Sequence, residues 1–162
     1  MLEQLWNAGF TVAAHLLNKC WRDSMGVLPD DEQAELWFRR AAEAGHDFSQ
    51  YALGKLLQSQ KRMDEAVSRY EKAAAQNSSD AQSSLGTIYY NGEGVTKDYA
   101  KAMEWYRKAA DQGNMYGEFN IGLLYEFGYG VTKNLDEAAK WYRRAANRGM
   151  ERAKTKLKEL GR

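Results

Sequence analysis

The chain has 162 residues, of which 44% are hydrophobic and 28% are charged; this composition excludes a disordered chain and supplies enough apolar side chains for one domain with a buried core. No apolar run approaches the ~20 residues that cross a bilayer, so we expect no membrane-spanning segment. The net charge of +1 gives no general attraction to nucleic acid or to anionic lipid.

The cysteine and glycine content further limits the class of protein to which the chain can belong. Cys20 is the single cysteine and cannot form an internal disulfide, and the N-terminal segment lacks the compact apolar block of a signal peptide. We therefore expect a cytoplasmic protein. The chain has 14 glycines and one proline, which favours helices that are separated by glycine turns.

An internal repeat organises the chain. The segment that begins LGTIYYNGEGV at Leu85 nearly recurs as IGLLYEFGYGV at Ile121, an offset of 36 residues. Two weaker copies lie upstream, and the one nearer to Leu85 lacks the GxGV insertion. In chain order the predicted units are 12–46, 47–78, 79–114 and 115–149, followed by a half-unit at 150–162.

Each unit is predicted to form two helices, here called helix A and helix B. In the third unit, Ala81, Leu85 and Tyr89 share one face of helix A at helical spacing, and Ala102 and Tyr106 share one face of helix B. Both helices therefore have an apolar side that must be covered.

The ends of these helices carry their own signals. Gly92 and Gly94 are expected to end helix A and to supply the positive φ of the turn, and Asp98 and Asn134 fit the N-cap position of helix B. Gly86 lies on the apolar face of helix A, where a side chain would push the neighbouring helix away. We therefore expect the two helices to approach closely at Gly86.

One such hairpin cannot bury both of its apolar faces, so the units are expected to stack into an all-α, right-handed α/α superhelix of about four repeats. The last segment fits a solitary helix A that caps the array. Ala153 and Leu157 take the positions of Ala81 and Leu85, and Lys158 takes the position of Gly86.

The unit LGxxYxxGxGVxxDxxxAxxWYxKAAxxG, as it stands at 85–113, resembles the Sel1-like repeat (SLR) family, which is related to tetratricopeptide repeats. The resemblance is strong over 79–149 and weaker over 12–78, and the unit at 47–78 looks more like a tetratricopeptide. It implies a scaffold that binds another protein on a concave wall of A helices, without catalytic residues. Some relatives carry a disulfide in each repeat, and the single cysteine departs from that subgroup.

The resemblance also implies which helix A positions face the groove, mainly those three before the glycine, one after it and four or five after it. Carried onto this sequence, these positions give four rows of partner-binding residues: Val12, His15, Lys19 and Arg22; Phe48, Tyr51, Lys55 and Gln58; Asp80, Ser83, Thr87 and Tyr90; and Tyr116, Phe119, Leu123, Glu126 and Phe127.

Large apolar side chains gather in two of these rows, around Phe48 and Tyr51 and around Tyr116, Phe119 and Phe127. Exposed aromatic patches often mark interaction sites, and aromatic anchors dominate binding energies. The alternative, which the sequence leaves open, is that these rings fill the seams between neighbouring repeats.

The sequence gives little support for catalysis or for metal binding. The two histidines, His15 and His46, are separated by a whole hairpin, and Cys20 lies five residues after His15, off the spacing of paired helical ligands. The GEGV and GYGV segments lack the strand that precedes a phosphate-binding loop. We expect no metal site, no cofactor and no enzymatic activity.

The C-terminal segment is basic, with Arg152, Lys154, Lys156 and Lys158 close together. Nucleic acid could use these groups as phosphate contacts, but the segment has no aromatic ring on which a base could stack. We favour a polar outer face or a site for an acidic partner surface. The N-terminal end shows no obvious polar cap, so we expect a monomer or weak self-association through that end.

The sequence therefore predicts a non-catalytic protein–protein interaction module, an adaptor or scaffold that holds a peptide or helix of a partner protein. The alternative is an inhibitory or immunity-type binder that clasps a toxin or an enzyme, for which we expect a large and salt-sensitive interface. The sequence does not identify the partner.

Overall fold

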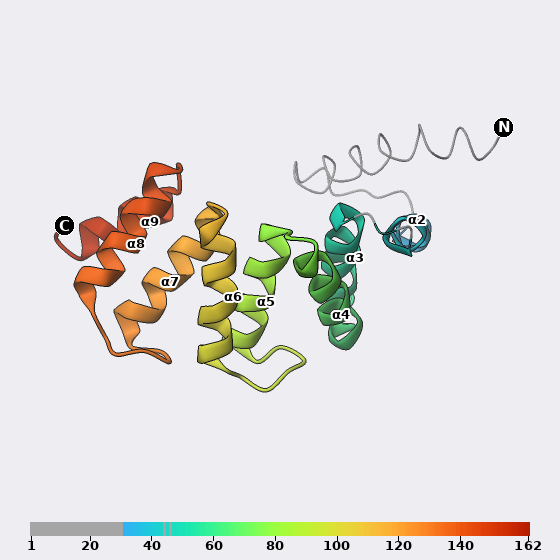
Figure 1. Ribbon diagram of the computed structural model, residues 1–162, viewed down its shortest axis with the longest axis horizontal. Helices are drawn as coiled ribbons and strands as arrows, with labels where there is room; N and C mark the ends of the chain where they lie inside the picture. Colours follow the sequence, from blue (N-terminus) through green and yellow to red (C-terminus); the bar gives the residue numbers. More distant parts are fainter. Residues whose placement is uncertain (1–30, 44, 46) are drawn as a thin grey trace. The chain divides into compact units, whose positions relative to one another are not determined.

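The computed structural model describes residues 31–43, 45 and 47–162 (Figure 1). The chain divides into an N-terminal unit, residues 1–69, and a C-terminal unit, residues 70–162. The described residues form helices and turns without any strand. The helices are α2 (Asp31–Glu43), α3 (Asp47–Ser59), α4 (Met63–Ala75), α5 (Ser79–Asn91), α6 (Tyr99–Asp111), α7 (Met115–Phe127), α8 (Leu135–Asn147) and α9 (Glu151–Glu159).

In the N-terminal unit, α2 packs against α3, and Leu53, Leu56 and Leu57 are fully buried. Four charged side chains join α2 to the start of α4. The Arg39 guanidinium pairs with the carboxylates of Glu35 (2.7 Å) and Glu65 (2.9 Å), and Arg62 pairs with the same two at 2.8 and 2.7 Å.

In the C-terminal unit, the helices from α5 to α9 pack in chain order, each against the next, and α5 also contacts α7 (Figure 1). The expectation that each hairpin is covered by the next one is thus confirmed here. The buried tyrosines Tyr106 and Tyr142 stand at the same position of successive B helices, which is 36 residues apart as the repeat requires.

The predicted helix ends are confirmed. The Asp98 carboxylate accepts a hydrogen bond from the Lys101 amide (3.0 Å), and the Asn134 side chain accepts from the amides of Asp136 and Glu137 (both 3.1 Å), as N-caps do. Gly92 ends α5 with φ +76°, in the left-handed region that glycine enters without strain.

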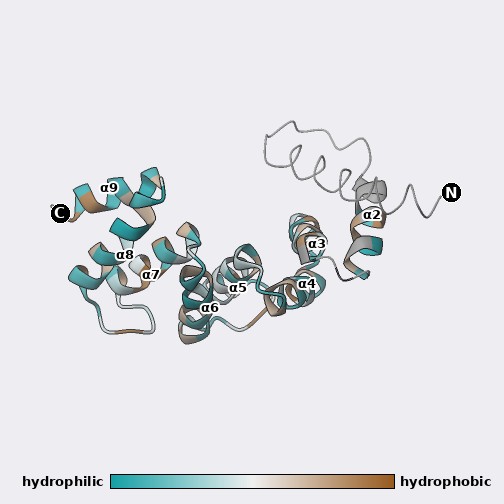
Figure 2. Cartoon of the chain, turned by 45° about the horizontal axis from the view of Figure 1, so that its top comes forward, coloured by the Kyte–Doolittle hydropathy of each residue, from teal (hydrophilic) through white to brown (hydrophobic). Residues whose placement is uncertain are grey.

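The predicted capping helix is α9. Its Ala153 is fully buried, whereas most other residues of the helix are exposed or half-buried. Figure 2 shows α9 as largely hydrophilic, in contrast to the mixed colouring of α7. A polar surface of this kind is typical of a helix that caps a repeat array.

Candidate interaction surface

The predicted groove residues of the C-terminal unit lie on α5 and α7, which are the A helices of successive units. The next A helix is α9, and we call the surface of α5, α7 and α9 the helix A face. The Asn114 side chain donates a hydrogen bond to the Asp80 carboxylate (2.9 Å), which ties the start of α7 to α5. The Lys156 ammonium donates to the Glu126 carboxylate (3.1 Å), which ties α9 to the end of α7.

A stripe of apolar side chains follows α7 on this face. Tyr116 is 55% exposed and Phe127 is 49% exposed, and Leu123 between them is half-buried. These positions are separated by seven and four residues, so they share one side of the helix. We call Tyr116, Leu123 and Phe127 the α7 stripe. Two of the four exposed large hydrophobic residues in the described part of the chain belong to it.

The start of α7 fixes the position of this stripe. The Asn114 side-chain oxygen accepts hydrogen bonds from the amides of Tyr116 (3.1 Å) and Gly117 (3.0 Å). Asn114 therefore caps the helix and places Tyr116 in its first turn. The helix ends at Gly128, whose φ is +75°, directly after Phe127.

Two residues that were assigned to the groove are buried, which corrects their assignment. Phe119 is 4% exposed, because its ring packs on Tyr142 with the centroids 5.3 Å apart and the Arg152 guanidinium of α9 covers it at 5.1 Å. The seam-packing alternative therefore holds for Phe119. Ser83 is also buried, and its carbonyl accepts a hydrogen bond from the Thr87 hydroxyl.

Two polar residues of the predicted rows on α5 and α7, Thr87 and Glu126, make contacts between helices. The Thr87 hydroxyl accepts a hydrogen bond from the Tyr106 phenol (3.2 Å). The Glu126 carboxylate accepts one from the Tyr142 phenol (2.5 Å). Burial raises the pKa of both phenols well above the ordinary value, and the neighbouring Glu126 carboxylate raises that of Tyr142 further. These residues hold the A and B helices together.

Tyr90 and Phe127 belong to a cluster of four aromatic rings at the glycine-turn end of the helix A face. Tyr99 and Tyr129 stack at a centroid distance of 4.9 Å, Tyr90 meets both edge-on at 5.4 and 5.9 Å, and Phe127 stacks on Tyr129 at 5.6 Å. Burial, followed by the neighbouring phenols Tyr129 and Tyr99, raises the pKa of Tyr90. The cluster extends the apolar surface of α7 to Tyr90 and Tyr99 of the third repeat.

Sequence reasoning did not include Tyr99 and Tyr129 in the site. Tyr129 lies in the glycine turn after α7, and Tyr99 is the first residue of α6, so neither fits a helix A position. The structure brings them together at Gly130, where an added Cβ would lie 2.8 Å from the Cβ of Tyr99. The turn of one unit thus lies against the start of helix B of the preceding unit.

In the N-terminal unit, Phe48, Tyr51 and Gln58 are half-buried and Lys55 is exposed. The Lys55 ammonium lies 6.0 Å from the centroid of the Tyr51 ring. The assignment of this row to a binding surface stays a prediction. The first row, namely Val12, His15, Lys19 and Arg22, lies outside the described residues, as do Cys20 and His46.

Over 31–43, 45 and 47–162, no three His, Cys, Asp or Glu side chains are grouped as metal ligands would be. Across these same residues, every helix is too short or too polar to cross a membrane. What the helix A face offers a ligand is apolar and aromatic surface with basic side chains of α9 beside it.

Units of two helices, stacked in chain order so that each covers the apolar side of the one before, define an α-helical repeat protein. The chain belongs to the Sel1 repeat family. The family model matches residues 21–46, 79–114 and 116–150, more than half of the chain. Sel1 repeats generally serve as protein-interaction modules and are typically non-catalytic. No curated protein sequence gives a significant match.

Solved structures agree with this assignment. A Sel1 repeat protein from Oxalobacter formigenes is 31% identical and superposes with a TM-score of 0.82, over 99% of this chain and 75% of its own. A protective antigen with an SLR fold, c5321 of uropathogenic Escherichia coli, is 35% identical with a TM-score of 0.80, but the match covers 95% of this chain and only 34% of that protein. The cysteine-rich protein B of Helicobacter pylori is 29% identical with a TM-score of 0.64, over 79% of this chain and 95% of its own.

Proposed function

We propose that the protein is an adaptor that binds a peptide or helix of a partner protein on the helix A face of its C-terminal unit. The observation that carries this proposal is the α7 stripe. Tyr116 and Phe127 are about half exposed on one side of a helix, although other sides of α7 already supply the core with Ile121 and Leu124. About half of each ring is therefore left uncovered by the packing within the chain.

The energetics favour a protein ligand. Complete burial of a large apolar side chain contributes about 1.5–3 kcal/mol, and aromatic anchors at the centre of an interface contribute more than most contacts around them. A partner that covers Tyr116, Leu123 and Phe127 therefore gains most of the affinity of a short peptide complex from this one helix.

The charges beside the stripe favour an acidic partner segment. The Lys156 ammonium lies 5.7 Å from the centroid of the Phe127 ring, and the Arg152 guanidinium lies over Phe119 on the same side of the unit. Lys156 is also paired with Glu126 and Glu159 (both 3.1 Å), so the exposed Arg152 is the cation more available to a ligand. We therefore expect an amphipathic segment with carboxylates flanking its apolar residues.

Site-specific photo-crosslinking in the native host tests the proposal. A photoreactive phenylalanine analogue replaces Tyr116 in one variant and Leu135 in the control, because Leu135 is another exposed apolar residue but lies on helix B, in α8. We expect one protein to be captured from position 116, to be lost when Phe127 is also changed to Ser, and not to be captured from position 135. Equal capture from both positions would contradict a binding surface on the helix A face.

A further inference from the structure

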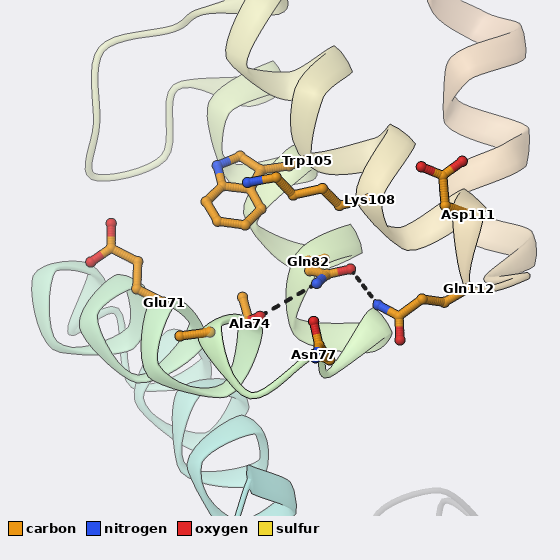
Figure 3. A pocket seen from close by; sticks show the side chains of 9 residues that line it. Glu71, Ala74, Asn77, Gln82, Trp105, Lys108, Asp111 and Gln112 are labelled. Carbon is orange, nitrogen blue, oxygen red and sulfur yellow. Dashed lines mark hydrogen bonds between the residues drawn. The ribbon is translucent and has the colours of Figure 1, made fainter.

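A hollow of about 810 Å³ lies in the C-terminal unit away from the α7 stripe, between the end of α4, the start of α5 and the last turns of α6 (Figure 3). The side chains at the base of the hollow, Gln82 and Gln112, are uncharged. The Gln82 amide donates a hydrogen bond to the Ala74 carbonyl (3.3 Å) and accepts one from the Gln112 amide (2.8 Å). Neither glutamine brings a charge into the hollow.

The equivalent place in the next repeat, 36 residues further along, is filled by the chain itself. Glu118 replaces Gln82 and Arg148 replaces Gln112. The Glu118 side chain is 0% exposed, and its carboxylate pairs with Arg144 (3.0 Å) and Arg148 (3.1 Å). The Arg148 guanidinium lies close enough to Gly113 that an added Cβ would be 2.8 Å from its Cζ atom. Guanidinium groups therefore occupy the fourth repeat where the third repeat is open.

The rim of the hollow is acidic. Glu71 and Asp111 line it with exposed carboxylates, and neither pairs with a cation among the described residues. Their counterparts one repeat later are Arg107 and Asn147. The acidic character is thus specific to the repeat in which the hollow is open.

An aromatic wall completes the site. Trp105 lines the hollow, with the Lys108 ammonium 4.2 Å from its ring centroid, as the Arg144 guanidinium lies 4.4 Å from Trp141 in the next repeat. Figure 3 shows Trp105 on one side, Glu71 on another and Asp111 beyond Lys108. Lys108 is exposed, so a cation that stacks better than an ammonium can displace it from the ring.

We propose that this hollow binds the guanidinium group of an arginine side chain from a partner protein, in place of the chain's own arginine that fills the fourth repeat. A guanidinium is planar, stacks on an indole ring and donates several hydrogen bonds to carboxylates. In the third repeat, Trp105 supplies the ring. Glu71 and Asp111 lie on opposite sides of the hollow (Figure 3), so a guanidinium on the ring pairs with one of these two carboxylates at a time. This site shares no residue with the α7 stripe, so it holds or fails independently of the function proposed above.

The direct test is a titration of the full chain with N-acetyl-arginine methylamide, followed by the indole N–H signal of Trp105 in a nitrogen–proton NMR spectrum. The matched neutral probe is N-acetyl-citrulline methylamide, which has the same shape without the charge. We expect a saturable shift of the Trp105 signal with the arginine probe only, and a weaker affinity as ionic strength rises. An equal response to both probes, or no response to either, overturns the proposal.

Two variants sharpen the test. The double change Glu71→Gln and Asp111→Asn removes both exposed carboxylates with little effect on the fold, and we expect the dissociation constant of the arginine probe to rise at least about tenfold. The control is Glu104→Gln, which removes an exposed carboxylate of α6 that does not line the hollow. An unchanged affinity in the double variant, or an equal loss in the control, overturns the proposal.

A third variant closes the hollow from within. Asn77→Gly, Gln82→Glu and Gln112→Arg together copy Gly113, Glu118 and Arg148 into the third repeat; Asn77 already has a positive φ of 64°, which glycine adopts freely. We expect this variant to keep its helical circular dichroism and to lose the arginine-induced shift of Trp105. Undiminished binding by this folded variant overturns the proposal, and the carboxylate variants decide the question by themselves if it does not fold.

Discussion

The ring of Tyr106 lies where a side chain on Gly86 would have to stand. A Cβ added to Gly86 would be 2.5 Å from both Cδ1 and Cε1 of that ring, and Gly122 has the same relationship to Tyr142, with 2.5 Å to Cε1 and 2.6 Å to Cδ1. Both tyrosines are buried, and their phenols are held by Thr87 and Glu126. The rings cannot swing aside without breaking these bonds, so glycine sets the distance between helix A and helix B.

Substitution of either glycine should therefore destabilise the fold. We expect Gly86→Val and Gly122→Val each to lower the free energy of unfolding by about 1–3 kcal/mol or more, because the added bulk must displace a buried ring. Urea unfolding followed by circular dichroism measures this. The control is Ala100→Val, which adds the same kind of bulk to an exposed position of α6 and should cost only about 0.5 kcal/mol in helix propensity. Equal losses at both kinds of site would show that helix A and helix B are not in close contact.

Glu118 provides a second prediction, because it is a buried carboxylate held by two half-exposed arginines. We expect Glu118→Ala to lower the free energy of unfolding by about 2–4 kcal/mol, since it removes two charge-assisted hydrogen bonds and leaves space behind. The double change Glu118→Gln and Arg148→Gln recreates the Gln82–Gln112 pair of the third repeat. It should therefore lower the free energy of unfolding by less than Glu118→Gln and Arg148→Gln do in sum. A double-mutant cycle measures this coupling, and strictly additive losses would contradict it.

The buried phenols predict a loss of stability at high pH. Burial raises the pKa of Tyr106 and Tyr142 in the folded protein, whereas unfolding returns both to the ordinary value of about 10. Their contribution is therefore complete below about pH 10 and is lost as the pH rises from there toward the folded pKa. Urea unfolding between pH 8 and 11.5 should show a decline that Tyr106→Phe makes shallower, because phenylalanine cannot ionise. A Tyr106 phenol that titrates near pH 10 in the folded protein would contradict this.

The four ion-paired side chains of the N-terminal unit lead us to predict a loss of stability at low pH. Hydrogen bonds from Arg62 and then Arg39 lower the pKa of Glu65 to about 2. A lowered folded pKa stabilises the unit above the ordinary pKa of Glu, about 4.3, and this contribution is lost as the pH falls toward 2. Carbon NMR should find the Glu65 carboxyl titrating near the low value in the native chain and closer to the ordinary one in Arg62→Gln. The control Lys72→Gln removes an exposed charge elsewhere on α4 and should leave the titration of Glu65 unchanged.

The sequence was sufficient to predict those features that depend on local chemistry and on the repeat. Asp98 and Asn134 were recognisable as caps because an N-cap needs only a short acceptor side chain before a helix. Gly86 was recognisable as a close contact because it interrupts an apolar face at the same place in successive units. The all-α stacking followed from hairpins with two apolar sides.

Features that depend on long-range packing were less accessible. Phe119 sits at a groove-facing position of helix A, and only the arrangement of α8 and α9 shows that Tyr142 and Arg152 cover it. Glu118 reads as a surface carboxylate in the sequence, and only the structure shows that it is buried and paired with Arg144 and Arg148. The hollow beside Trp105 became visible only when two repeats were compared in three dimensions, because an unfilled space leaves no motif.

The most direct test of the account is the affinity of the partner segment captured at position 116 for variants of the α7 stripe, measured by isothermal titration calorimetry. We expect Tyr116→Ala and Phe127→Ala each to weaken binding at least about tenfold, as loss of an aromatic anchor does, while circular dichroism stays the same and Leu135→Ala binds like the native chain. If both stripe variants bind the segment as tightly as the native chain does, the helix A face is not the binding surface.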